Sequence, residues 1–151
     1  MWLVCGTHVC SRRRSQIVHE SLYDEFIVKL KAAYGTVKIG DPLEEGTLMG
    51  PLHTAAAVKQ YTDGIEAIKA QGGKILCGGK VVEGEGHFVE PTVVEIDASA
   101  EIINTELFVP ILYVMKFSDI DEAIAMNNAV PQGLSSSIFT NNSGTMWKWL
   151  G

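Results

Sequence analysis

The amino-acid sequence predicts an α/β fold, with an open, mostly parallel sheet flanked by helices. Short apolar segments with the composition of strands alternate with segments whose apolar residues recur at helical spacing. The segment 110–117 is almost continuously apolar, which is typical of a strand covered by helices on both faces. The sequence shows no internal repeat and no low-complexity linker, so these elements are expected to form one domain.

The first half of the chain is expected to contain two strands and two helices. Residues 16–18 have the composition of a short buried strand, and no element is recognisable before them. A helix begins near Ser21, whose hydroxyl can cap the first turn, and ends at Gly35. A strand is expected over residues 74–77. That strand is preceded by a second expected helix, which ends at Gly72. The apolar side of this helix is formed by Val58, Tyr61, Ile65 and Ile68.

The second half adds further strands and helices around the segment 110–117. Residues 87–95 have strand composition, although Pro91 restricts such a strand to a sheet edge or a bulge. Ser118 is expected to cap a third helix. Residues 134–140 form a further strand, and residues 146–150 form a helical turn. Because the chain opens without a recognisable element and stops inside a helical pattern, we expect a domain that is truncated at both ends.

The composition argues against two classes of partner. The formal net charge of -6 disfavours nucleic acid, and the short basic run Arg12–Arg14 is interpreted as a solvated strand edge. No apolar run approaches the roughly 20 residues of a membrane span. The opening residues are too short and lack the basic residue of a signal peptide. We therefore expect a cytoplasmic protein without a membrane partner.

The cysteines, histidines and serines do not form a familiar site by themselves. Cys5, Cys10 and Cys77 have no metal-ligand spacing, and their odd number disfavours a disulfide framework. Each is either buried filler or a reactive thiol. The four histidines do not form a metal-binding set, so no metal is expected. The run Ser135–Ser137 lacks the G-x-S-x-G elbow of serine hydrolases.

Several short motifs follow one another in an order that resembles the aldehyde dehydrogenase superfamily, in the half after its catalytic cysteine. The segments 50–54, 110–114 and 133–140 look specifically like its antiquitin type, whose aldehyde is α-aminoadipic semialdehyde. The resemblance covers residues 18–151 as a partial catalytic domain and leaves residues 1–17 as a divergent leader. The motifs that carry it are His19-Glu20, Gly50-Pro51, Glu90-Pro91-Thr92, Glu106-Leu107-Phe108-Val109-Pro110 and Gly133-Leu134.

The resemblance implies an NAD-dependent oxidation of a small-molecule aldehyde to the carboxylate, in a homotetrameric parent enzyme. Spacing back from His19 places Cys10 on the nucleophile position. A thiolate there attacks the aldehyde carbon to give a thiohemiacetal, hydride leaves to the nicotinamide, and water hydrolyses the resulting thioester. The residues before Cys10 differ from the Gly-Gln that the family usually carries. The alternative is therefore a chance cysteine in an altered leader.

The resemblance also assigns Glu106 and Phe108 to the cofactor. Glu106 would accept hydrogen bonds from the ribose hydroxyls next to the nicotinamide, as a carboxylate can from two vicinal hydroxyls. Phe108 would pack near the nicotinamide and the ribose. Both lie in a loop at the end of the strongest strand, where α/β proteins often place ligand contacts. The alternative for Glu106 is a surface charge at the end of a helix.

Two hypotheses of different classes remain. The family's general-base glutamate, its oxyanion-hole asparagine and its main nucleotide-binding fold all precede the nucleophile and are missing from this sequence. The chain is either a catalytic-domain portion of a working enzyme, or a truncated, inactive product that acts as a binding or subunit-interaction module. The altered residues before Cys10 favour the second. Under either hypothesis, part of the cover for segment 110–117 is expected to lie outside this chain, which predicts exposed apolar surface and poor solubility.

Overall fold

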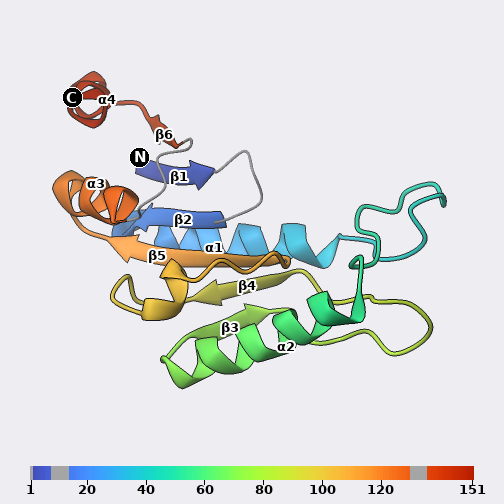
Figure 1. The fold of residues 1–151 in the computed structure, drawn as a ribbon. Helices are drawn as coiled ribbons and strands as arrows, with labels where there is room; N and C mark the ends of the chain where they lie inside the picture. Colours follow the sequence, from blue (N-terminus) through green and yellow to red (C-terminus); the bar gives the residue numbers. More distant parts are fainter. Residues whose placement is uncertain (1, 8–13, 130–135) are drawn as a thin grey trace.

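The computed structural model describes residues 2–7, 14–129 and 136–151 (Figure 1). The elements in chain order are β1 (Trp2–Thr7), β2 (Arg14–His19), α1 (Glu20–Gly35), α2 (Ala55–Ala70), β3 (Lys74–Cys77), β4 (Thr92–Glu95), the 3₁₀ helix η1 (Glu101–Asn104), β5 (Ile111–Phe117), α3 (Ile120–Asn128), β6 (Ser137–Thr140) and α4 (Ser143–Leu150).

The strands form one open sheet in the order β3-β4-β5-β2-β1-β6. The pairs β4–β5 and β5–β2 are parallel, whereas β3–β4, β2–β1 and β1–β6 are antiparallel. The α/β open sheet is therefore confirmed, but it is mixed, and parallel pairing is confined to the adjacent strands β4, β5 and β2. One reason is that β1 ends at Thr7 and β2 begins at Arg14, while a parallel crossover needs about a dozen residues or more.

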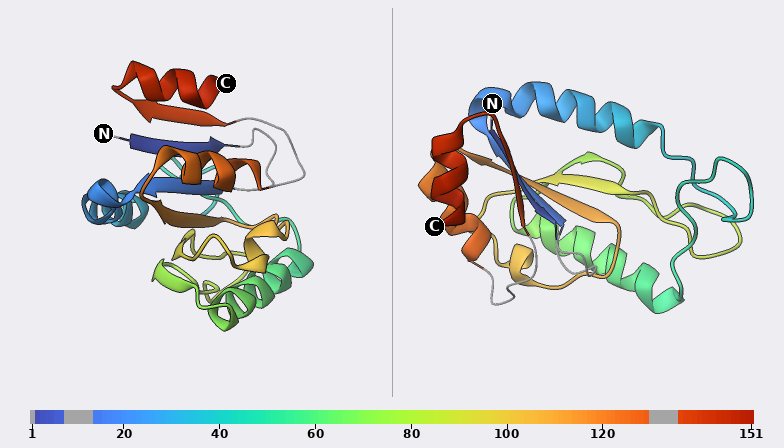
Figure 2. Two further views of the ribbon diagram at one scale, coloured as in Figure 1. Left: turned by 90° about the vertical axis from the view of Figure 1, so that its left-hand side faces the viewer. Right: turned by 90° about the horizontal axis from the view of Figure 1, so that it is seen from above.

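Helices cover both faces of the central strands, as the apolar segment 110–117 predicts (Figure 2). Side chains alternate along β5, so that Leu112 and Val114 pack with Tyr23 of α1. Their neighbours on β5 face the other way, into a larger cluster with α2, η1 and α3. All of β5 except Lys116 is buried, and the part of the chain described here supplies its cover.

Several element boundaries differ from the sequence-based expectations. The opening residues form β1, an element that the sequence did not reveal, because pairing with β2 and β6 stabilises it. Helix α1 is capped by the His19 side chain, which accepts from the Ser21 backbone N–H, so Ser21 is not the cap. The strand expected over 87–95 begins only at Thr92, because Pro91 has no backbone N–H to donate. Residues 134–135 of the expected last strand lie outside the described residues.

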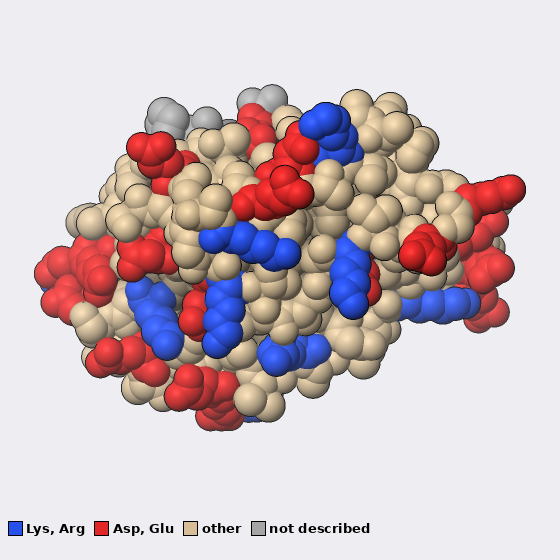
Figure 3. All heavy atoms as spheres, turned by 90° about the horizontal axis from the view of Figure 1, so that it is seen from below, with Lys and Arg blue, Asp and Glu red and all other residues tan. Residues whose placement is uncertain are grey.

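The surface carries charges of both signs. On the face drawn in Figure 3, Lys and Arg side chains are bordered by Asp and Glu, and acidic side chains gather at both ends of the view. Among the described residues, no helix is long and apolar enough to cross a lipid bilayer.

Candidate functional site

The loop 105–110 connects η1 to β5 and enters β5 at its amino end. Because β2, β4 and β5 run parallel, their amino ends share one edge of the sheet (Figure 1). The rule that ligands bind beyond the carboxyl ends of strands therefore does not support this loop as a ligand site. The assignment of this loop as a ligand site therefore depends on the side chains of the loop itself.

The side chains of this loop differ in burial from one residue to the next. Leu107 and Val109 are half-buried and pack against the main hydrophobic cluster. Phe108, between them, is 45% exposed. Glu106 is half-buried and its Oε1 atom has almost no contact with solvent, unlike an ordinary surface charge. The loop thus presents an aromatic ring at the surface and keeps a carboxylate partly sheltered beside it.

A groove of about 370 Å³ runs beside the loop, between α2 and η1. Its apolar lining includes Leu107 from the loop and Ile102 from η1. Its polar lining comes from α2, where Lys59 pairs with Asp63 at 2.6 Å and the charges largely compensate. The complete lining is Ala56, Lys59, Gln60, Asp63, Gly64, Ala67, Ile102 and Leu107.

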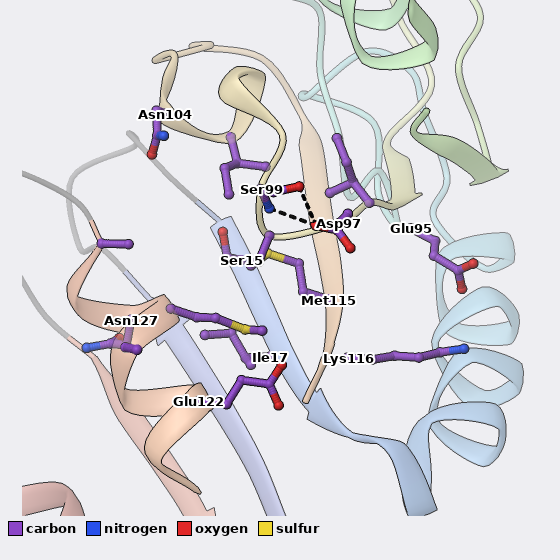
Figure 4. Close-up of a pocket in the computed structure, with 16 residues that line it drawn as sticks. Ser15, Ile17, Glu95, Asp97, Ser99, Asn104, Met115, Lys116, Glu122 and Asn127 are labelled. Atoms are coloured by element: carbon purple, nitrogen blue, oxygen red, sulfur yellow. Dashed lines mark hydrogen bonds between the residues drawn. The ribbon is translucent and has the colours of Figure 1, made fainter. Parts of the chain in front are cut away.

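A larger cavity of about 730 Å³ lies between the sheet, η1 and α3 (Figure 4). Ile17 and Met115 contribute apolar surface to it from β2 and β5. Asp97 on its rim accepts hydrogen bonds from the Ser99 hydroxyl and backbone N–H, which lower the pKa of the Asp97 carboxyl. Sequence reasoning missed this cavity, because its lining comes from segments far apart in the chain. Among the described residues, no cluster of His, Cys, Asp and Glu could hold a metal ion.

The candidate nucleophile Cys10 lies outside the described residues. Arg14, four residues later, begins β2 next to β5. Cys77, in contrast, is a free, half-buried thiol on β3. Burial raises the pKa of the Cys77 thiol, which disfavours the reactive thiolate.

Other motif residues have structural roles in this part of the chain. The Tyr61 hydroxyl donates to the Glu90 carbonyl at 2.8 Å and lies 2.6 Å from the Thr92 hydroxyl oxygen. The Gly79 N–H donates to the hydroxyl oxygens of both Tyr61 and Thr92. This network fixes the connection between β3 and β4 on α2. Gly133 and Leu134 lie outside the described residues.

Comparison with known proteins gives an almost complete match to one family. The model of the family described as "Aldehyde dehydrogenase family" matches residues 3–151. An aldehyde dehydrogenase family 7 member A1 from Pisum sativum is 59% identical over 142 residues, which cover 94% of this chain and 28% of the relative. An alpha-aminoadipic semialdehyde dehydrogenase from Bos taurus is 47% identical over 143 residues, which cover 94% of this chain and 26% of the relative.

A solved structure agrees with the sequence relatives. A variant of betaine aldehyde dehydrogenase from Staphylococcus aureus, in complex with NAD+, is 29% identical and superposes with a TM-score of 0.83. The superposition covers 89% of this chain and 28% of that one. The chain thus spans little more than a quarter of the length of the proteins it matches. Its sequence and its fold agree on one assignment, and the chain belongs to the aldehyde dehydrogenase family.

Proposed function

We propose that this chain is part of an NAD-dependent aldehyde dehydrogenase that oxidises α-aminoadipic semialdehyde or a similar aldehyde to the carboxylate. The observation that carries the proposal is the loop 105–110, which exposes Phe108, keeps Glu106 sheltered and contributes Leu107 to the groove on α2. The substrate class follows the name of the Bos taurus relative, and the cofactor follows the NAD+ complex of the Staphylococcus aureus protein.

The residues of the loop fit a nicotinamide cofactor. A carboxylate oxygen has two lone pairs and can accept from ribose hydroxyls, and because Glu106 Oε1 has almost no contact with solvent, Oε2 is the atom that would accept them. The exposed ring of Phe108 offers an apolar surface against which a nicotinamide can pack. When bound, the nicotinamide supplies the acceptor for the hydride. Glu106 would orient the cofactor and would not itself take part in bond making or breaking.

We assign the covalent step to Cys10. Its thiolate adds to the aldehyde carbon, the carbon loses hydride to give a thioester, and water cleaves the thioester to the acid and the free thiol. Two observations support this assignment: Cys10 is four residues before β2, and β2 lies beside β5 with its amino end at the same sheet edge as loop 105–110.

Glu106→Gln tests the cofactor assignment. The host is the Pisum sativum relative in which residues 14–151 of this chain replace the corresponding segment, called here the 14–151 chimera. We expect a lower dehydrogenase rate and a higher KM for NAD, with esterase activity preserved, because ester hydrolysis needs no hydride acceptor. The exposed Glu101, changed to Gln, is the matched control and should alter neither activity. Equal loss of both activities, or loss of neither, would overturn the assignment.

Cys10→Ala tests the nucleophile in a second chimera that carries residues 1–151. Esterase activity should disappear in Cys10→Ala and persist in Cys77→Ala, because the thiol of Cys77 is half-buried and its pKa is raised. Esterase activity that survives Cys10→Ala, or that is absent from the chimera before any substitution, rules out Cys10 as a working nucleophile.

The second candidate function is an inactive binding module. It is favoured by exposed apolar side chains at the β6 end of the sheet, where Phe139, Trp147 and Leu150 are 58%, 65% and 65% exposed. This candidate would be supported if the 1–151 chimera had neither dehydrogenase nor esterase activity while the 14–151 chimera had both. The cytoplasmic location and the tetrameric parent enzyme stay predictions.

A further inference from the structure

The segment that leads to the cofactor loop lies along α2 and is fixed to it at two places. At one end, the Gln71 side chain, just after α2, accepts a hydrogen bond from the Ile102 backbone N–H at 2.9 Å. At the other end, Leu107 lies against α2 at Gly64. Ile102 and Leu107, the two residues that make these contacts, form one wall of the groove beside the loop.

Gly64 makes the second contact possible. A Cβ atom added to Gly64 would lie 2.8 Å from Leu107 Cδ1 and 3.6 Å from Leu107 Cδ2, so the end of the Leu107 side chain would have to shift to make room for it. Glycine inside a helix is unfavourable compared with alanine. Its presence in the middle of α2 is explained by the close approach of this one leucine.

We propose that Leu107 and Gly64 are a positioning pair for the cofactor loop. Leu107 separates Glu106 from Phe108, and consecutive Cα atoms are only about 3.8 Å apart. A shift of Leu107 away from α2 would therefore displace the carboxylate and the aromatic ring together. The inference rests on the proposed cofactor role of Glu106 and Phe108. It states that the packing of Leu107 against Gly64 sets the position of these two side chains.

Gly64→Ala in the 14–151 chimera separates positioning from stability. The added methyl group should push Leu107 outward, and the KM for NAD should rise about tenfold, since small misplacements of bound groups are costly. Esterase activity should be unchanged. The melting temperature should be unchanged or higher, because alanine is the better helix former. A weaker cofactor interaction in a protein of equal stability cannot come from partial unfolding.

Leu107→Ala and one double variant complete the test. Leu107→Ala should also raise the KM for NAD, because the loop loses its anchor. Combining Gly64→Ala with Leu107→Val should bring the KM back toward that of the unsubstituted chimera, since the smaller side chain leaves room for the added methyl group. The control is Ile68→Val on the same helix, a fully buried position outside the groove, which should lower the melting temperature and leave the KM for NAD unchanged.

The Glu106→Gln measurement distinguishes failure of this inference from failure of the proposed function. If Glu106→Gln raises the KM for NAD while Gly64→Ala and Leu107→Ala do not, the positioning role is wrong and the cofactor assignment stands. If Glu106→Gln leaves the KM unchanged, the assignment of Glu106 fails. A raised KM in Ile68→Val would also overturn the positioning role, because any loss of packing would then have the same effect.

Discussion

Tyr23 is a buried tyrosine whose hydroxyl faces a carboxylate. Its side chain is 3% exposed, and the hydroxyl donates to Glu95 Oε2 at 2.5 Å. Lys116 Nζ lies 4.2 Å from the centre of the ring. Burial, followed by the hydrogen bond and the negative charge of Glu95, raises the pKa of Tyr23 well above its ordinary value of 10.0. The folded chain therefore holds this phenol in its protonated form.

The raised pKa of Tyr23 predicts a loss of stability at alkaline pH. A group whose pKa is higher in the folded state stabilises the fold fully below its unfolded pKa, here near 10.0, and this stabilisation is lost as the pH rises toward the folded pKa. The free energy of unfolding of the 151-residue chain should therefore fall above about pH 10. Tyr23→Phe should make that fall less steep. Identical pH dependence in the two proteins would show that Tyr23 is not responsible.

The start of α3 shows which of two neighbouring residues caps a helix. The sequence suggested Ser118, but Asp119 is the N-cap and its carboxylate accepts from the backbone N–H groups of Asp121 and Glu122. Ser118 instead donates from its hydroxyl and its backbone N–H to the Glu122 side chain. Both residues are good caps by type. The helix begins at Ile120, directly after Asp119.

Alanine substitutions at these two positions should differ in cost. Asp119→Ala removes the cap and the negative charge at the helix start, so it should destabilise the chain by about 1 kcal/mol. Ser118→Ala keeps the backbone hydrogen bond to Glu122 and should cost less than about 0.5 kcal/mol. Urea unfolding of both variants measures the difference. A larger cost for Ser118→Ala would show that the serine is the effective cap.

At the scale of the whole molecule, helices bury the strands at the centre of the sheet, whereas apolar side chains are left exposed at its β6 end. The sequence predicted exposed apolar surface around segment 110–117, and this location is wrong, because both faces of β5 are covered. Several of the exposed large apolar side chains lie on β6 and α4, where Phe139, Trp147 and Leu150 are all more than half exposed. Large exposed apolar side chains grouped in this way favour association.

The 151-residue chain should therefore self-associate and bind a hydrophobic dye. Replacing Phe139 with Ser and Trp147 with Lys should reduce both effects, because these changes remove exposed apolar area without touching the core. Light scattering and dye fluorescence measure them, with Val28→Ser on α1, also an exposed position, as the control. If the unsubstituted chain is a monodisperse monomer that binds no dye, the prediction is wrong.

The sequence by itself determined most of the local structure and the family. Helices α1 and α2 and strands β3 and β5 follow its patterns closely, because apolar spacing, glycine and proline act within a few residues of each other. The order of short motifs was enough to indicate the aldehyde dehydrogenase family, which the match to residues 3–151 confirms. The roles of Cys10, Glu106 and Phe108 come from the same resemblance and stay proposals.

Only the tertiary structure decided how distant segments meet. It made β1 an antiparallel strand between β2 and β6, and it placed Leu107 against Gly64, more than forty residues away in the chain. Neither outcome has a local signal, because an apolar leader and a helical glycine are each compatible with many neighbours. Such contacts depend on which surfaces remain uncovered once the elements have formed, and burial of apolar surface between elements selects among them.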